Sequence, residues 1–227
     1  MSRAQAVLWD LDGTIIDSLS IFTEIIEKVF PQIGLKALKR HEIRPEFYGS
    51  VEDVLNRLSK GYKDQDELFQ LFLDNQLSQY GHPSAHEGIH DAITHFSSHG
   101  FQQAVVTSRD SYEGTPYGSR TIIKTLKLDL HIKTVICGDD TPHHKPHPEP
   151  LLMALKQLGV DPENAVMVGD QPVDAQAAQA AGCKSILIDF EKTKDSKAAH
   201  VSANPDLVCT NAHEIIEGVH KLLDINV

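Results

Sequence analysis

Two aspartates near the start of the chain, Asp10 and Asp12, directly follow the apolar run Ala6–Trp9. A short apolar run that ends in polar residues and a glycine is typical of a strand buried on both faces of a parallel sheet. Ligands of open parallel sheets bind beyond the carboxyl ends of the strands. We therefore expect these carboxylates to lie at a site of chemistry, the alternative being a solvated surface loop.

Polar residues follow other apolar runs in the same way. Thr107 and Ser108 follow the second run, and Asp170 follows the fourth, with Asp174 four residues later. Lys145 lies in the loop after the third run. Because parallel strands end at one edge of a sheet, we expect these side chains to gather there.

Such a set of side chains suits a metal ion and a phosphoryl group. Crowded carboxylates raise one another's pKa unless a cation compensates them. Mg²⁺ prefers oxygen ligands and binds through few carboxylates together with substrate phosphate. A carboxylate can attack phosphorus, and a second acid two residues on can protonate the leaving oxygen and later deprotonate water. The sequence thus indicates Mg²⁺ as the cofactor.

The rest of the pattern predicts an α/β fold with a helical insertion. From residue 83 onward, helical and strand-like segments alternate, which is typical of a doubly wound parallel sheet. Residues 16–82 have helical spacing throughout and predict an inserted all-helical cap, which leaves 1–15 and 83–227 as the α/β core. The predicted core strands after the first are 104–106, 134–137, 165–168, 185–188 and 207–209. The predicted helices are 15–30, 45–61, 64–80, 89–99, 121–128, 148–158, 172–181 and 211–223.

Composition narrows the class of protein. The 227-residue chain carries a net charge of -11 at pH 7, which does not suit binding to a phosphate backbone, so we expect no nucleic-acid partner. No apolar run approaches the roughly 20 residues that span a bilayer, so we expect no membrane partner. The three cysteines have no CxxC spacing, and we expect them to be buried thiols of a protein in a reducing compartment. We expect a cytoplasmic protein.

Four segments, taken in order, resemble the four motifs of the haloacid dehalogenase superfamily. They are Asp-Leu-Asp-Gly-Thr at 10–14, Val-Val-Thr-Ser at 105–108, Lys-Pro at 145–146 and Gly-Asp-Gln-Pro-Val-Asp at 169–174. The segments 17–18, 138–140 and 145–152 are similar to the phosphoglycolate phosphatase-like branch, whose cap is helical. The resemblance is strong over the core and weak over the insertion.

The resemblance implies a role for each matching residue. Asp10 is the nucleophile, and Asp12 is the general acid and base. Thr107 and the backbone amide of Ser108 hold the transferring phosphoryl oxygens. Lys145 neutralises both the nucleophile and the phosphate.

The resemblance also implies the metal and substrate contacts. Mg²⁺ is bound by Asp10, by the backbone carbonyl of Asp12 and by Asp170, while Asp174 holds a metal-bound water. In the insertion, the segment where such caps reach over the site contains Arg44, Gly49 and Ser50. These three residues are candidate substrate contacts, with a simple helix-capping turn as the alternative.

The expected function is hydrolysis of a small phosphomonoester through an aspartyl-phosphate, with phosphoglycolate as the first substrate. Pyrophosphate, nucleoside monophosphates and sugar phosphates follow. A β-phosphoglucomutase-type mutase shares the core motifs, although Gly13-Thr14 favours a phosphatase. A catalytically silent binding protein on the same fold is opposed by the complete set of motif residues. A small phosphorylated metabolite is the expected partner, and both monomer and homodimer stay open.

Two further features leave alternatives open. His143, His144 and His147 surround Lys145 in the sequence. They form either a transition-metal site or part of a polar loop. The polar loop is favoured, because the chain has 13 histidines. Arg109 begins a stretch in which glycine and proline obscure the start of the next helix. Its side chain either contacts an anionic substrate or is solvated.

Overall fold

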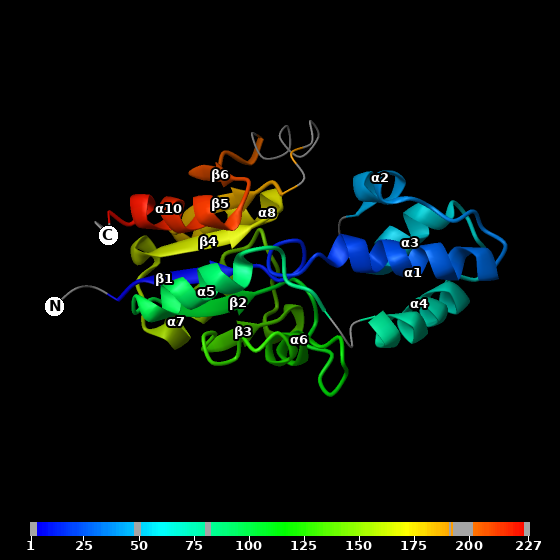
Figure 1. Cartoon of the computed structure of the whole chain (residues 1–227), viewed down its shortest axis with the longest axis horizontal. Helices are drawn as coiled ribbons and strands as arrows, with labels where there is room; N and C mark the ends of the chain where they lie inside the picture. Colours follow the sequence, from blue (N-terminus) through cyan, green and yellow to red (C-terminus); the bar gives the residue numbers. More distant parts are fainter. Residues whose placement is uncertain (1–3, 48–50, 80–82, 191, 193–201, 225–227) are drawn as a thin grey trace.

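The computed structural model describes residues 4–47, 51–79, 83–190, 192 and 202–224. It consists of a sheet with helices on both faces and a separate group of helices beyond one end of the sheet (Figure 1). The sheet has six parallel strands in the order β3-β2-β1-β4-β5-β6. These strands are β1 (Ala6–Trp9), β2 (Gln102–Val106), β3 (Thr134–Ile136), β4 (Ala165–Gly169), β5 (Lys184–Ile188) and β6 (Leu207–Cys209). The predicted doubly wound parallel sheet is confirmed.

Strand β1 lies in the middle of the sheet and shows why the fold is layered. All four of its residues are fully buried, because helices cover both faces. Val7 and Trp9 belong to one apolar cluster and Ala6 and Leu8 to the other, as the pleat of a strand requires. The first cluster includes residues of α5 (Ile89–Ser98), α6 (Ser119–Thr125) and α10 (Ala212–Leu222), and the second those of α7 (Glu149–Leu158) and α8 (Pro172–Ala181).

The strand register aligns the ends of the central strands. Trp9 at the end of β1 pairs with Val105 of β2 and with Val168 of β4. The backbone amide of Asp10 continues the ladder and donates to the carbonyl of Val168 at 2.8 Å. The polar residues that follow these strands therefore begin at the same level of the sheet.

The helical insertion has an apolar cluster of its own. It comprises α1 (Ser18–Gln32), α2 (Arg40–Ile43), the short 3-10 helix η1 (Arg44–Glu46), α3 (Val51–Ser59) and α4 (Gln65–Gln79). Phe22, Phe30, Leu55 and Phe72 are buried in this cluster and belong to neither cluster of the sheet. Its separate core supports the predicted division into core and cap. The division stays a prediction, and its boundary residue 82 lies outside the described residues.

The two linkers to this insertion run side by side. Ile16 forms a bridge with Ala85, and the backbone amide of His86 donates to the carbonyl of Ile15 at 2.9 Å. Asp17 caps α1 by accepting from the amide of Ser20 at 3.0 Å. The insertion thus leaves and rejoins the core at one place.

Several helix boundaries differ from the prediction. The prediction ends the first helix at residue 30, before Pro31, whereas α1 continues to Gln32, since proline in the last turn removes only one helical hydrogen bond. Helix α6 begins at Ser119, earlier than predicted. Helix α2 was not predicted, because its four residues are too short to show a period. No helix within the described ranges combines the length and apolar character needed to cross a bilayer.

Candidate active site

Lys145 is the centre of a buried charge cluster beyond the ends of the central strands. Its Nζ lies 2.9 Å from Oδ1 of Asp10 and 2.6 Å from Oδ1 of Asp174. It also donates to the backbone carbonyl of Val106 at 3.1 Å. The side chains of the lysine and the two aspartates are 2%, 10% and 1% exposed, so little water screens their charges.

The carboxylates of the cluster carry more negative charge than Lys145 offsets. Burial, reinforced by Asp174, raises the pKa of Asp10 to about 7 although Lys145 acts in the opposite direction. Burial, with repulsion from Asp10 and Asp174, raises the pKa of Asp170 well above its usual range. Burial disfavours the ammonium of Lys145, but attraction to Asp10 and Asp174 outweighs it and raises the pKa of that group.

This donor set fits a divalent cation. Asp10, Asp170 and Asp174 each offer a carboxylate oxygen, and these oxygens all lie within 4.8 Å of one another. Oxygen donors with excess negative charge are what Mg²⁺ prefers. Asp174 is additionally anchored, because its Oδ2 accepts from the backbone amide of Gln171 at 3.0 Å.

Two glycines let these carboxylates approach the backbone. A Cβ on Gly13 would lie 2.3 Å from Oδ2 of Asp170, and a Cβ on Gly169 would lie 2.2 Å from Oδ2 of Asp174. Gly13 also has φ +78°, a conformation that other residues rarely adopt. Both glycines are therefore required by the packing around the carboxylates.

Arg109 connects the second motif to the first. Its guanidinium donates to both carboxylate oxygens of Asp12, and its backbone amide donates to Oγ1 of Thr107 at 3.1 Å. The predicted alternatives for Arg109 were contact with an anionic substrate and solvation. Neither describes this contact, because the partner of Arg109 is the carboxylate of Asp12 in the same chain. The 97-residue separation of the pair explains why local sequence did not reveal it.

The structure thus brings most of the predicted residues to one edge of the sheet. Asp10, Lys145, Asp170 and Asp174 share one cluster, and Thr107 is buried at the end of β2. Ser108, whose predicted contact is made by its backbone amide, is exposed, and Arg44 belongs to η1 in the insertion. The candidate substrate contacts Gly49 and Ser50 lie outside the described residues.

Comparison with known proteins agrees with this geometry. The model of the family described as haloacid dehalogenase-like hydrolase matches residues 7–188. Phosphoglycolate phosphatase 1 of Pseudomonas aeruginosa is 25% identical over 228 residues, which cover 96% of this chain and 81% of that protein. Pyrophosphatase PpaX of Bacillus cereus is 27% identical over 222 residues, which cover 94% and 95% of the two chains.

A solved structure has the same fold. A candidate β-phosphoglucomutase from Thermotoga maritima superposes with a TM-score of 0.78 at 20% identity, covering 96% of this chain and 99% of that one. At this identity the similarity concerns the fold alone. The fold, and the resemblance that the four motifs carried, are both confirmed.

Proposed function

Because the chain belongs to the haloacid dehalogenase-like hydrolase family, we propose that it is a Mg²⁺-dependent phosphatase of a small phosphomonoester. Phosphoglycolate is the first candidate substrate. The proposal depends above all on the contact between Asp10 and Lys145. A buried carboxylate held 2.9 Å from a buried ammonium can be ionised and aimed at a phosphoryl group without bulk water competing.

The proposed reaction has two displacements on phosphorus. A carboxylate oxygen of Asp10 attacks the phosphorus atom, and the bond to the leaving oxygen breaks. Asp12 donates the proton that the leaving oxygen needs. Asp12 then removes a proton from water, whose oxygen attacks the aspartyl-phosphate and releases inorganic phosphate. Asp10 and Asp12 return to their starting protonation states.

Other residues hold the phosphoryl group and the charge. Thr107 and the backbone amide of Ser108 bind the phosphoryl oxygens, and Lys145 offsets their charge. The residues proposed to hold Mg²⁺ are Asp10, the backbone carbonyl of Asp12, and Asp170. When bound, the ion neutralises the negative charge that builds up on the phosphoryl oxygens.

Asp174 is proposed to hold a water on the metal rather than the metal itself. Lys145 engages one of its oxygens and the amide of Gln171 the other. Both carboxylate oxygens are therefore already used for hydrogen bonding, which favours the indirect role.

The names of two relatives support two candidate substrates. The name of the Pseudomonas relative supports phosphoglycolate, and that of the Bacillus relative supports pyrophosphate as the alternative. Arg44, Gly49 and Ser50 of the insertion are proposed to contact the substrate. Closure of the insertion over the cluster would exclude water and select the leaving group.

A substrate panel tests the proposal. Purified protein with MgCl₂ is incubated with phosphoglycolate, pyrophosphate, nucleoside monophosphates, sugar phosphates and β-glucose 1-phosphate, and released phosphate is measured. Phosphate release that EDTA abolishes is the expected result. Isomerised sugar phosphate without free phosphate would identify a mutase, and a lack of turnover on the whole panel would favour a silent binding protein.

The nucleophile can be tested separately. Asp10→Asn is expected to abolish turnover and to retain the fold, since the amide has the same shape. Acid quenching during turnover should leave one phosphoryl group on the peptide that contains Asp10. The absence of that adduct, together with activity in the variant, would refute the covalent mechanism.

We also propose that the protein acts in the cytoplasm. Cys137, Cys183 and Cys209 are free and buried. Burial raises the pKa of Cys137 to about 11 and that of the other two to about 12, so the thiols stay protonated and unreactive. Such thiols suit a reducing compartment.

A further inference from the structure

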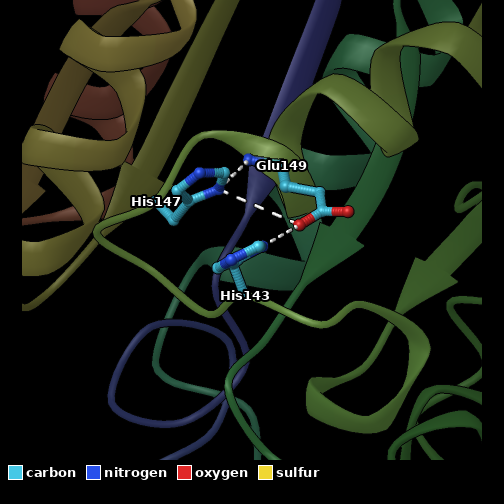
Figure 2. Close-up of side chains that lie close together, drawn as sticks. All are labelled: His143, His147 and Glu149. Carbon is cyan, nitrogen blue, oxygen red and sulfur yellow. Dashed lines mark hydrogen bonds and ion pairs between the residues drawn. The ribbon is translucent and has the colours of Figure 1, made fainter.

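Two of the three histidines around Lys145 meet a carboxylate on the outer side of the same loop. Figure 2 shows His143 and His147 side by side, with Glu149, the first residue of α7, facing both. The Nδ1 atoms of His143 and His147 lie 2.7 Å and 3.9 Å from the same oxygen, Oε2 of Glu149. The two rings stack with centroids 4.3 Å apart and an interplanar angle of 24°.

The hydrogen bonds define which atoms can bind an ion. The backbone amide of Glu149 donates to Nδ1 of His147 at 3.2 Å, so this nitrogen carries no proton, and its lone pair turns from the amide to an ion when one binds. A carboxylate only accepts, so the proton between His143 and Glu149 is carried by Nδ1 of His143. A cation that takes the place of this proton would be met by two imidazole nitrogens and a carboxylate oxygen.

We propose that His143, His147 and Glu149 form a site for Zn²⁺. Their ligand atoms lie within 4.8 Å of one another, which allows one ion to contact all three after small side-chain rotations. Two imidazoles and one carboxylate are a common zinc ligand set, in which water completes the coordination. Mg²⁺ prefers oxygen donors and is therefore expected to bind this site more weakly than Zn²⁺.

The site differs from the carboxylate cluster in donor type and in exposure. The side chains of His143, His147 and Glu149 are 61%, 48% and 34% exposed, so a hydrated ion can reach them directly. In the carboxylate cluster Asp10 and Asp174 are buried and Asp170 is partly exposed, and all of the donors are oxygens. Different divalent ions are thus expected to occupy the two places.

An ion at this site would also constrain the loop that contains Lys145. Lys145 lies in the sequence midway between the two histidines, and its ammonium is fixed by Asp10 and Asp174. A Zn²⁺ that joins His143 to Glu149 closes the loop around this lysine. Binding to the folded loop alone also stabilises the folded protein by linkage.

Zinc titration calorimetry of the full chain tests the proposal. Saturating MgCl₂ is present throughout, so that the carboxylate cluster is occupied, and the variants are His143→Ala, His147→Ala and Glu149→Gln. The wild type is expected to bind one Zn²⁺ at this site, and each variant to bind it at least about tenfold more weakly, as expected for loss of a ligand. His144→Ala is the matched control, because His144 is an exposed neighbour outside the ligand group and is expected to leave the affinity unchanged.

Two further measurements keep the result interpretable. Thermal unfolding without zinc checks that each variant folds. We expect each variant to fold, because the substituted side chains are exposed to solvent. In NMR spectra, Zn²⁺ should shift the ring signals of His143 and His147 but not those of His144. The proposal is overturned if the wild type binds no zinc beside Mg²⁺, if the ligand variants bind it as tightly as the wild type, or if His144→Ala weakens it equally.

Discussion

The guanidinium of Arg109 holds both carboxylate oxygens of Asp12. Its Nε lies 2.7 Å from Oδ2 and its Nη2 lies 2.5 Å from Oδ1. Nη1 donates to the carbonyl of Tyr117 at 3.3 Å, which fixes the plane of the guanidinium. The side chains of the pair are only 12% and 28% exposed. Asp12 is therefore oriented by Arg109, and each of its oxygens keeps a second lone pair through which it can share a proton with a leaving group.

Loss of this orientation is expected to depend on the leaving group. Arg109→Ala should lower kcat/KM for an alkyl phosphate by about 10²-fold, because general acid catalysis by an oriented carboxyl contributes about that much. The loss should be much smaller for p-nitrophenyl phosphate, whose leaving group needs no proton. Steady-state kinetics with both substrates measures the difference.

Two variants complete this comparison. Arg109→Lys retains the charge but not the paired geometry, so it should recover only part of the activity. Arg120→Ala removes an arginine that pairs with Glu113 and Asp140 instead, and it should leave the leaving-group dependence unchanged. An equal loss on both substrates would mean that Arg109 does not act through Asp12.

Removal of the central ammonium should destabilise the fold in a pH-dependent way. Lys145→Met leaves Asp10 and Asp174 buried without their counter-charge, which should lower the free energy of unfolding at pH 8 by about 3–5 kcal/mol. At pH 5 the loss should be smaller, because Asp10, whose pKa burial raises to about 7, can take up a proton instead. Urea unfolding in EDTA at the two pH values measures both effects.

Lys156→Met provides the control for this experiment. Lys156 is exposed on α7, and its loss should change the free energy of unfolding by less than about 0.5 kcal/mol at either pH. A penalty for Lys145→Met that is the same at pH 5 and pH 8 would contradict the electrostatic explanation.

The sequence predicted those parts of the fold that depend on interactions between residues close together in the chain. Helix α8 spans the predicted residues 172–181, because Pro172 favours the first helical turn and Gly182, at φ +83°, ends the helix. Asn211 caps α10 at the start of the predicted helix 211–223, accepting from the amide of Glu214 at 3.0 Å. The gathering of Asp10, Lys145, Asp170 and Asp174 was predicted because parallel strands share one carboxyl edge.

Contacts between distant segments were not predictable in this way. The pair of Arg109 and Asp12 requires that the loop after β2 turn back over the end of β1, and no local period records that turn. Glu149 was not grouped with His143 and His147, because only the folded loop brings its carboxylate toward Nδ1 of both histidines. Side-chain partners of this kind depend on tertiary geometry.

The metal-free carboxylate cluster should make stability fall as pH rises. The pKa of Asp10 is about 7 in the folded protein against 3.8 ordinarily, so between these values the folded state holds more protons than the unfolded state. Unfolding free energy therefore decreases from about pH 4 to about pH 7 through this group. Mg²⁺ relieves the repulsion and should raise Tm more at pH 8 than at pH 5, as calorimetry with and without EDTA can measure.

Asp170→Asn tests the origin of that effect. Removing one charge should raise the Tm of the metal-free protein at pH 8 by roughly 2–4 °C, equivalent to about 1 kcal/mol, and should remove most of the Mg²⁺ response. Asp129→Asn, at an exposed loop position, should do neither. A metal-free Tm for Asp170→Asn below that of the wild type would show that repulsion is not what dominates at this position.

Gly13 and Gly34 have nearly the same backbone conformation but different surroundings. A comparison of the two positions therefore distinguishes the effect of backbone strain from that of steric contact with the site. Their φ angles are +78° and +77°, so alanine should cost about 1–2 kcal/mol of stability at either position. Gly34 has no atom within 4 Å of the added Cβ, whereas the Cβ at Gly13 would lie 2.3 Å from Oδ2 of Asp170. Gly34→Ala should therefore keep full phosphatase activity.

Gly13→Ala must displace the Asp170 carboxylate and should lower kcat at least about tenfold, with weaker Mg²⁺ dependence of Tm. Equal kcat in the two variants would show that the placement of Asp170 against Gly13 is not needed for turnover.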